Sequence, residues 1–171
     1  MADDPKHLVR TGAFGRESGV HGRHPFNPNS EMYMTRLSER TGLKRLPVNL
    51  MRLPPSKESF IPHAHSVEEE WVFVIEGEGT VTLDGVATAI GAGDFIGFPN
   101  DGVVHHMTNT HAADDLVYLT GGEHAPVEIA HMPTIGKVAV FKDSAVTFYD
   151  EDTGQRVTMA EWFERAKIAE G

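Results

Sequence analysis

Short runs of hydrophobic residues, separated by turn-forming residues, dominate the middle of the chain. Between residues 61 and 120, Gly, Pro and Asp recur every few positions, and the stretches between them are rich in β-branched and aromatic side chains. These stretches read WVFVIE, TVTL, VATAI, DFIGF, VVHHMTN and LVYLT. Many short strands joined by tight turns are typical of a β-sandwich or barrel. No segment with helical periodicity interrupts them, so the pattern predicts an all-β domain.

The flanking segments extend this domain on both sides. Residues 1–30 are rich in Gly, Pro, His and charged residues and show little periodicity, which predicts an irregular N-terminal arm. Two strand-like runs, MYMTRLS and VNLMRL, come before the central region, and KVAVF with AVTFYD predicts a hairpin after it. We therefore expect residues 31–150 to form one barrel.

A turn and a short helix are expected in residues 151–171. Thr158 and Glu161 have the spacing of a capping box, in which each residue satisfies a backbone donor at the start of a helix. Apolar residues follow at helical spacing and predict a face that docks on the same protein. These residues are Met159, Trp162, Phe163 and Ala166.

Length, composition and charge exclude several classes of protein. A chain of 171 residues fits one domain, and the absence of Cys excludes disulfides and thiolate ligands and is compatible with the cytoplasm. The net charge of -10 disfavours nucleic acid and anionic lipid as partners. No run of about 18 apolar residues predicts a membrane span. We expect a cytoplasmic protein whose partner is a small molecule.

Candidate metal ligands lie where the central strands begin. His63 and His65 are separated by one residue, so in an extended chain both side chains project from the same face. Glu70 stands five positions further on, and His105 supplies a distant third histidine. Two histidines so close together also occur by chance, but three imidazoles and a carboxylate suit a first-row transition metal. A GxSxG elbow, a P-loop and an HExxH helix are all absent from the sequence.

The spacing of these residues resembles the two sequence motifs of the cupins. The first motif, G(x)5HxH(x)3-4E(x)6G, is matched by His63, His65, Glu70 and Gly77. The second motif, G(x)5PxG(x)2H(x)3N, is matched by Gly93, Pro99, Gly102, His105 and Asn109. Two departures concern the rim of the barrel: Lys57 replaces the first glycine, and one extra residue separates Pro99 from Gly102. The resemblance covers about residues 45–122 and is strongest to an uncharacterised bacterial group of single-domain cupins.

The resemblance implies a double-stranded β-helix, the jelly-roll barrel of cupins, with the short helix appended at its C-terminal end. It implies that His63, His65, Glu70 and His105 bind one divalent transition metal, which is Fe, Mn, Ni, Co or Zn. Six residues separate Glu70 from Gly77, so Glu70 takes the first position of the strand, whereas Glu68 and Glu69 are expected in the preceding loop, facing water. Alternation along the later strand favours His105 over His106. Single-domain cupins commonly pair through their sheets, so we also expect a homodimer.

A mostly apolar pocket is expected around the metal. Strand parity places Ile61, Val72, Val74 and Met107 on the same side as the ligands, and Tyr118 is a further candidate for the pocket lining. Such a pocket favours a small oxygenated organic substrate. The resemblance implies either a dioxygenase or isomerase type of enzyme, or a non-catalytic protein that binds or senses a small ligand. The absence of a helix-turn-helix domain favours the enzyme. Catalytic residues, substrate and reaction are not identified by the sequence.

Overall fold

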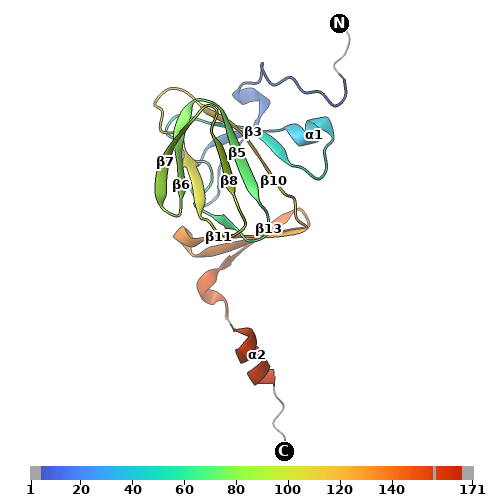
Figure 1. Ribbon diagram of the computed structural model, residues 1–171, viewed down its shortest axis with the longest axis vertical. Helices are drawn as coiled ribbons and strands as arrows, with labels where there is room; N and C mark the ends of the chain where they lie inside the picture. The colour runs from blue at the N-terminus through green and yellow to red at the C-terminus, as the bar shows by residue number, and fades with distance from the viewer. Residues whose placement is uncertain (1–4, 156, 167–171) are drawn as a thin grey trace, which may run out of the picture.

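The computed structural model describes residues 5–155 and 157–166, and three antiparallel sheets form most of the protein (Figure 1). The largest sheet has the order β1 (Val20–Gly22), β2 (Met32–Arg36), β3 (Val48–Leu53), β10 (Leu116–Gly122), β5 (Glu70–Glu76), β8 (Phe95–Phe98). A three-stranded sheet has the order β7 (Val86–Gly91), β6 (Glu78–Leu83), β9 (His105–Thr108). A four-stranded sheet has the order β13 (Ala145–Asp150), β12 (Lys137–Lys142), β11 (Val127–Met132), β4 (Ala64–His65).

Helical segments are short. They are η1 (Arg16–Ser18), α1 (Leu37–Thr41), η2 (Pro133–Ile135), η3 (Glu151–Thr153) and α2 (Met159–Ala166). Within the described part of the chain, no helix is long and apolar enough to cross a membrane.

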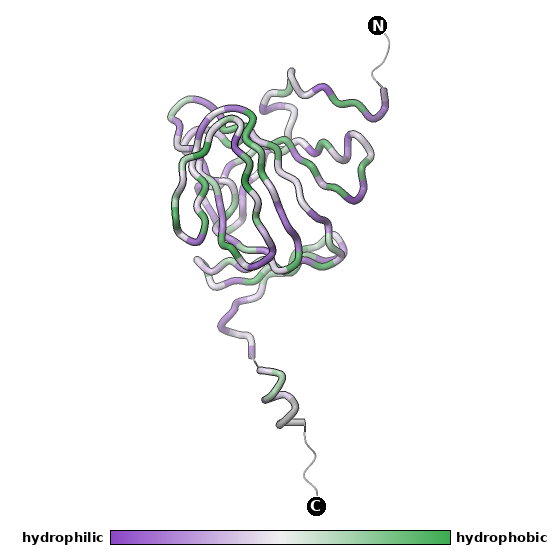
Figure 2. Tube along the Cα trace, viewed as in Figure 1, coloured by the Kyte–Doolittle hydropathy of each residue, from purple (hydrophilic) through white to green (hydrophobic). Residues whose placement is uncertain are grey.

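The main hydrophobic core lies between the six-stranded and three-stranded sheets, because both contribute buried residues to one cluster. In β5, Val72 and Val74 are buried while Phe73 and Ile75 are exposed, as expected when successive side chains point to opposite faces. Figure 2 shows hydrophobic stretches, in green, along the barrel strands. The predicted all-β jelly-roll fold with a short C-terminal helix is therefore confirmed.

The segment before β5 links the three-stranded sheet to the four-stranded sheet. An isolated antiparallel bridge joins His63 to His105, the first residue of β9. Only two residues later, His65 pairs with Ala130 of β11. This crossing brings residues that are distant in the sequence to one end of the barrel.

The predicted strand MYMTRLS is too long, because the chain forms α1 after Arg36. The Ser38 side chain explains the turn: its hydroxyl donates to the Leu46 carbonyl at 2.7 Å and accepts the Val48 amide at 2.6 Å. Gly42 ends the helix at a φ of 82°, which favours glycine. The last two residues of the predicted strand therefore belong to α1, and the contacts of Ser38 stabilise the turn that leads back to β3.

The N-terminal arm contains more regular structure than its composition predicts. It includes η1 and β1, and β1 pairs with β2 at the edge of the largest sheet. The Asn27 amide donates to the Glu58 carboxylate at 2.7 Å and to the Phe60 carbonyl at 2.6 Å. These contacts attach the described part of the arm to the segment that leads into the candidate ligands.

The predicted C-terminal helix is present as α2. The Thr158 amide and hydroxyl both donate to the Glu161 carboxylate at 2.8 Å, and the Glu161 amide donates back to the Thr158 hydroxyl at 3.2 Å, as in a capping box. However, Met159 and Trp162 are 67% and 61% exposed, so they do not form the predicted docking face against the barrel. The side chains of Phe163 and Ala166 lie outside the described residues.

Candidate metal centre

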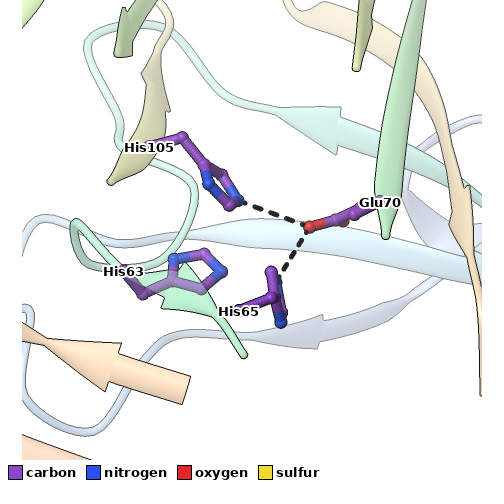
Figure 3. A group of neighbouring side chains, drawn as sticks. All are labelled: His63, His65, Glu70 and His105. Atoms are coloured by element: carbon purple, nitrogen blue, oxygen red, sulfur yellow. Dashed lines mark ion pairs between the residues drawn. The ribbon is translucent and has the colours of Figure 1, made fainter. Parts of the chain in front are cut away.

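The structure brings the four predicted ligands together (Figure 3). Three of them lie on strands, and His63 lies just before β4. His65 ends β4, Glu70 begins β5 and His105 begins β9, while His63 is held by its bridge to His105. One donor atom of each residue lies within 4.8 Å of the donor atoms of the other three. Donors on opposite sides of a bound ion stand about 4.2 Å apart, given metal–nitrogen distances of about 2.1 Å. The cluster therefore has nearly the dimensions of a metal site.

Backbone carbonyls fix the tautomers of His63 and His105. The Nδ1 atom of His63 lies 2.8 Å from the Ile61 carbonyl oxygen, and that of His105 lies 3.1 Å from the Val103 carbonyl oxygen. A carbonyl oxygen only accepts, so each Nδ1 carries the hydrogen and each neutral ring has its lone pair on Nε2. The Phe98 ring stacks on His105 with a centroid distance of 3.9 Å and further limits the ring orientation.

The third histidine, His65, is oriented by a carboxylate instead. Its Nδ1 atom lies 3.4 Å from Oε1 of Glu128, and its Nε2 atom lies 3.3 Å from Oε2 of Glu70. Both ring nitrogens of His65 thus face a carboxylate, and neither makes a hydrogen bond with a described residue. Outer carboxylates commonly orient ligand histidines so that the other ring nitrogen faces the metal. All three imidazoles can thus present Nε2.

Glu70 is the centre of the cluster. Its Oε2 atom lies 3.5 Å from Nε2 of His105, and its Oε1 atom accepts the Thr120 hydroxyl at 2.6 Å. The Nε2 atoms of His65 and His105 are buried and make no hydrogen bond with any described residue. Buried polar atoms without a partner are costly, and a bound ion would satisfy both nitrogens. The residues therefore fit a divalent metal.

The pKa values of the cluster residues favour the binding of a cation. Burial raises the pKa of Glu70, but His105, His65 and Thr120 outweigh this effect and hold the pKa below its ordinary value. Burial also lowers the pKa of His65, yet Glu70 and Glu128 outweigh it and raise that pKa. Burial and the neighbouring His105 lower the pKa of His63 to about 4. At neutral pH the cluster therefore contains an ionised Glu70 and a neutral His63.

Glu128 was not identified from the sequence. It is only 3% exposed, and its carboxylate accepts the backbone amides of Ser66, Val67 and Glu68 at 3.0, 3.2 and 2.7 Å. It thus shapes the loop between His65 and Glu70 as well as facing His65. The sequence carried no signal for it: no strand was predicted in this segment, VEIAHM, and Glu128 alternates with the hydrophobic Val127 and Ile129, a pattern that would place it on the outer face.

A cavity of about 440 Å³ opens onto His63, His65 and Glu70. Ile61 lines this cavity, whereas Val72, Met107 and Tyr118 line a small pocket of about 30 Å³ shared with His105. Val74 lies in the barrel core and lines neither space.

The arm contributes to the cavity in a way that its composition did not indicate. His24 and Pro25 both line the cavity, and the His24 ring meets the Phe60 ring edge-on at 6.3 Å. Burial lowers the pKa of His24. Lys57, at the departure from the first motif, does not line the cavity; its Nζ atom lies 3.2 Å from Oε2 of Glu31. The wall therefore joins the arm, the large sheet and the four-stranded sheet.

The neighbouring residues Glu68, Glu69 and His106, which the sequence disfavoured as ligands, lie outside the four-residue cluster. The Glu68 carboxylate accepts the Ala125 amide at 2.6 Å, and Glu69 is exposed. In β9 the burial alternates, so that His105 is buried and His106 is half-buried on the other face. A second possible cluster, formed by His65, Glu68 and Glu128, shares His65 with the first.

Residues 49–121 match the family model of the cupin domain. This match and the structural similarities below identify a cupin domain within the chain. No curated protein matches the sequence.

Three solved structures illustrate the similarity. A proposed sugar phosphate isomerase from Acidithiobacillus ferrooxidans has a TM-score of 0.84 and 28% identity, covering 91% of this chain and 99% of that chain. A sugar phosphate isomerase of the cupin superfamily from Silicibacter pomeroyi has a TM-score of 0.72 and 25% identity, covering 85% and 96%. A predicted oxalate decarboxylase from Thermotoga maritima has a TM-score of 0.55 and 25% identity, covering 69% and 99%.

Proposed function

We propose that this cupin is a metal-dependent enzyme of the dioxygenase or isomerase type that acts on a small oxygenated organic substrate. The observation that carries the proposal is the convergence of His63, His65, His105 and Glu70, because the first two histidines and the glutamate line a cavity large enough for a small molecule. The similar proteins described as isomerases and as a decarboxylase support chemistry at a site of this kind.

An open site supports catalysis over a structural role. Structural zinc sites are typically closed by four ligands that include thiolates, and this chain has no Cys. Three imidazoles and one carboxylate would leave about two positions of an octahedral shell free. Since His63, His65 and Glu70 line the cavity, those positions would face a ligand.

The ion would supply a Lewis acid that polarises a substrate oxygen. The protein contributes orientation. Thr120 and the two histidines hold the Glu70 carboxylate, and the Ile61 and Val103 carbonyls hold two imidazoles before any ion binds. A prearranged set of donors lowers the cost of assembling the site. The apolar side chains of Phe60 and Ile61 line the cavity beside it.

Elemental analysis and activity assays test the proposal together. Untagged protein is expected to contain about one divalent transition metal per chain or to take up added Fe, Mn, Ni, Co or Zn. Metal-loaded protein is then assayed for oxygen consumption and for isomer formation with small phenols, diketones and hydroxy acids. His105→Ala should abolish both metal uptake and turnover, while His106→Ala should keep them.

Two results would contradict the proposal in different ways. The absence of any metal uptake would remove the site itself. Saturable binding of a ligand at the metal, with no turnover across the whole panel, would instead favour a non-catalytic binding or sensing protein.

A further inference from the structure

We infer that the cavity beside the metal cluster takes an uncharged, largely apolar molecule that offers one or two oxygen atoms, and not a sugar phosphate. The inference deepens the proposed function and rests on it for the anchoring of the ligand oxygen. It differs from what the names of the two similar isomerases describe.

The side chains of the cavity wall carry an excess of negative charge. Among the described residues that line the cavity, none is Lys or Arg, whereas Glu68, Glu69, Glu70 and Glu123 all line it. A bound divalent ion would offset only two of these four negative charges. Proteins bind phosphate groups with Arg, Lys or helix N-termini, and repulsion in a partly enclosed cavity is stronger than in bulk water. A phosphate dianion would therefore be disfavoured.

The cavity wall offers few neutral hydrogen-bonding groups. Apart from acidic and histidine side chains, the polar side chains of the wall are Asn49 and Thr120. The Thr120 hydroxyl already donates to Glu70. A polyhydroxylated sugar would thus leave several hydroxyls without partners, and buried polar groups without partners cost free energy.

Much of the cavity wall is apolar. Met34, Met51 and Met132 line the cavity together with several aromatic rings, including Phe60 and Phe148. Methionine side chains adapt to the shape of a ligand and make favourable contacts with aromatic rings. The wall therefore suits a hydrophobic group, while the metal cluster at its base suits the ligand oxygen.

The matched pair 2-phenylethanol and 2-phenylethyl phosphate tests the inference, with ribose 5-phosphate as a sugar phosphate. Each is titrated into metal-free and metal-loaded protein with ¹³C-labelled methionine methyls. We expect 2-phenylethanol to shift the Met34, Met51 and Met132 signals, and both phosphates to bind about tenfold more weakly or worse. The signal of Met159, which is exposed on α2, serves as a control and should not move.

Charge reversal makes the test specific. Glu69→Lys, at the cavity, should narrow the difference between the two phenyl compounds, while Glu76→Lys, an exposed glutamate of β5 outside the lining, should not. Equal or tighter binding of either phosphate by the wild type, or no methionine shifts with 2-phenylethanol, would overturn the inference. Since the measurement is also made without metal, failure of metal binding would count against the proposed function alone.

Discussion

His63 and His105 are oriented in one way and His65 in another, although all three can present Nε2 to the same point. The first two histidines each donate to a carbonyl two residues earlier in the chain. His65 instead faces Glu128, which lies on β11 and is brought close by the pairing of β4 with β11. Local contacts thus set two ligands, and the third depends on the complete fold.

Removal of a ligand tests the four-residue site itself and has the largest expected effect. His105→Ala and Glu70→Ala should each lower metal affinity by more than about a hundredfold, beyond the usual effect of outer residues. His106→Ala and Glu69→Ala should bind metal almost as the wild type does. Competition with a chromophoric chelator measures the affinity, and circular dichroism verifies folding. Loss of metal in His106→Ala but not in His105→Ala would reverse the assigned register of β9.

Acidification should weaken metal binding through His65 before it affects His63. The pKa of His65 is raised above 6.5, whereas that of His63 is lowered to about 4. Protons compete with the metal for His65, so affinity should be complete above its raised pKa. It should then fall by about tenfold per pH unit below that pKa. Chelator competition between pH 8 and pH 5 measures this dependence. Constant affinity over that range would contradict the raised pKa of His65.

Glu128→Gln separates the two modes of orientation. The substitution removes the charge next to His65 but keeps one oxygen for the loop amides, so metal affinity should fall about 10- to 100-fold. Imidazole nitrogen NMR should show altered ring signals for His65, while His63 and His105 keep the tautomers set by their carbonyl contacts. Glu123→Gln is the control, because this exposed carboxylate accepts, among the described residues, a single hydrogen bond, which comes from the Glu69 amide at 3.2 Å. Equal losses in both variants would show that Glu128 has no specific role.

The smallest effect is expected from Thr120→Val. This change removes one hydrogen bond to Glu70 with little change of shape, and a net hydrogen bond contributes about 0.5–1.5 kcal/mol, or a two- to tenfold change in affinity. Thr88→Val, at an exposed position of β7, is the matched control and should leave metal affinity unchanged. A loss as large as that of Glu70→Ala would mean that Thr120 is itself a ligand.

The sequence predicted the parts of the structure that depend on local pattern. The six central runs correspond to β5 through β10, and the Thr158–Glu161 capping box begins α2. The spacing of His63 and His65 also indicated a shared face. In each case the signal lies within a few residues, where strand alternation or helix capping acts directly.

Contacts over long separations were not predictable. Glu128 meets the loop amides across 60 to 62 positions of sequence, and no strand was predicted in the segment that contains it. His24 lines the cavity because Asn27 attaches the arm to Glu58 and Phe60. Both placements depend on how the sheets assemble, which alternation within one strand does not specify.

Anomalous diffraction from crystals of the metal-loaded wild-type protein tests the central claim most directly. We predict one strong peak about 2.0–2.2 Å from the Nε2 atoms of His63, His65 and His105 and from an oxygen of Glu70. The second possible cluster, which shares His65 with Glu68 and Glu128, provides a clear alternative position. A peak there, coordination of His65 through Nδ1, or no peak at the four-residue cluster would contradict the account.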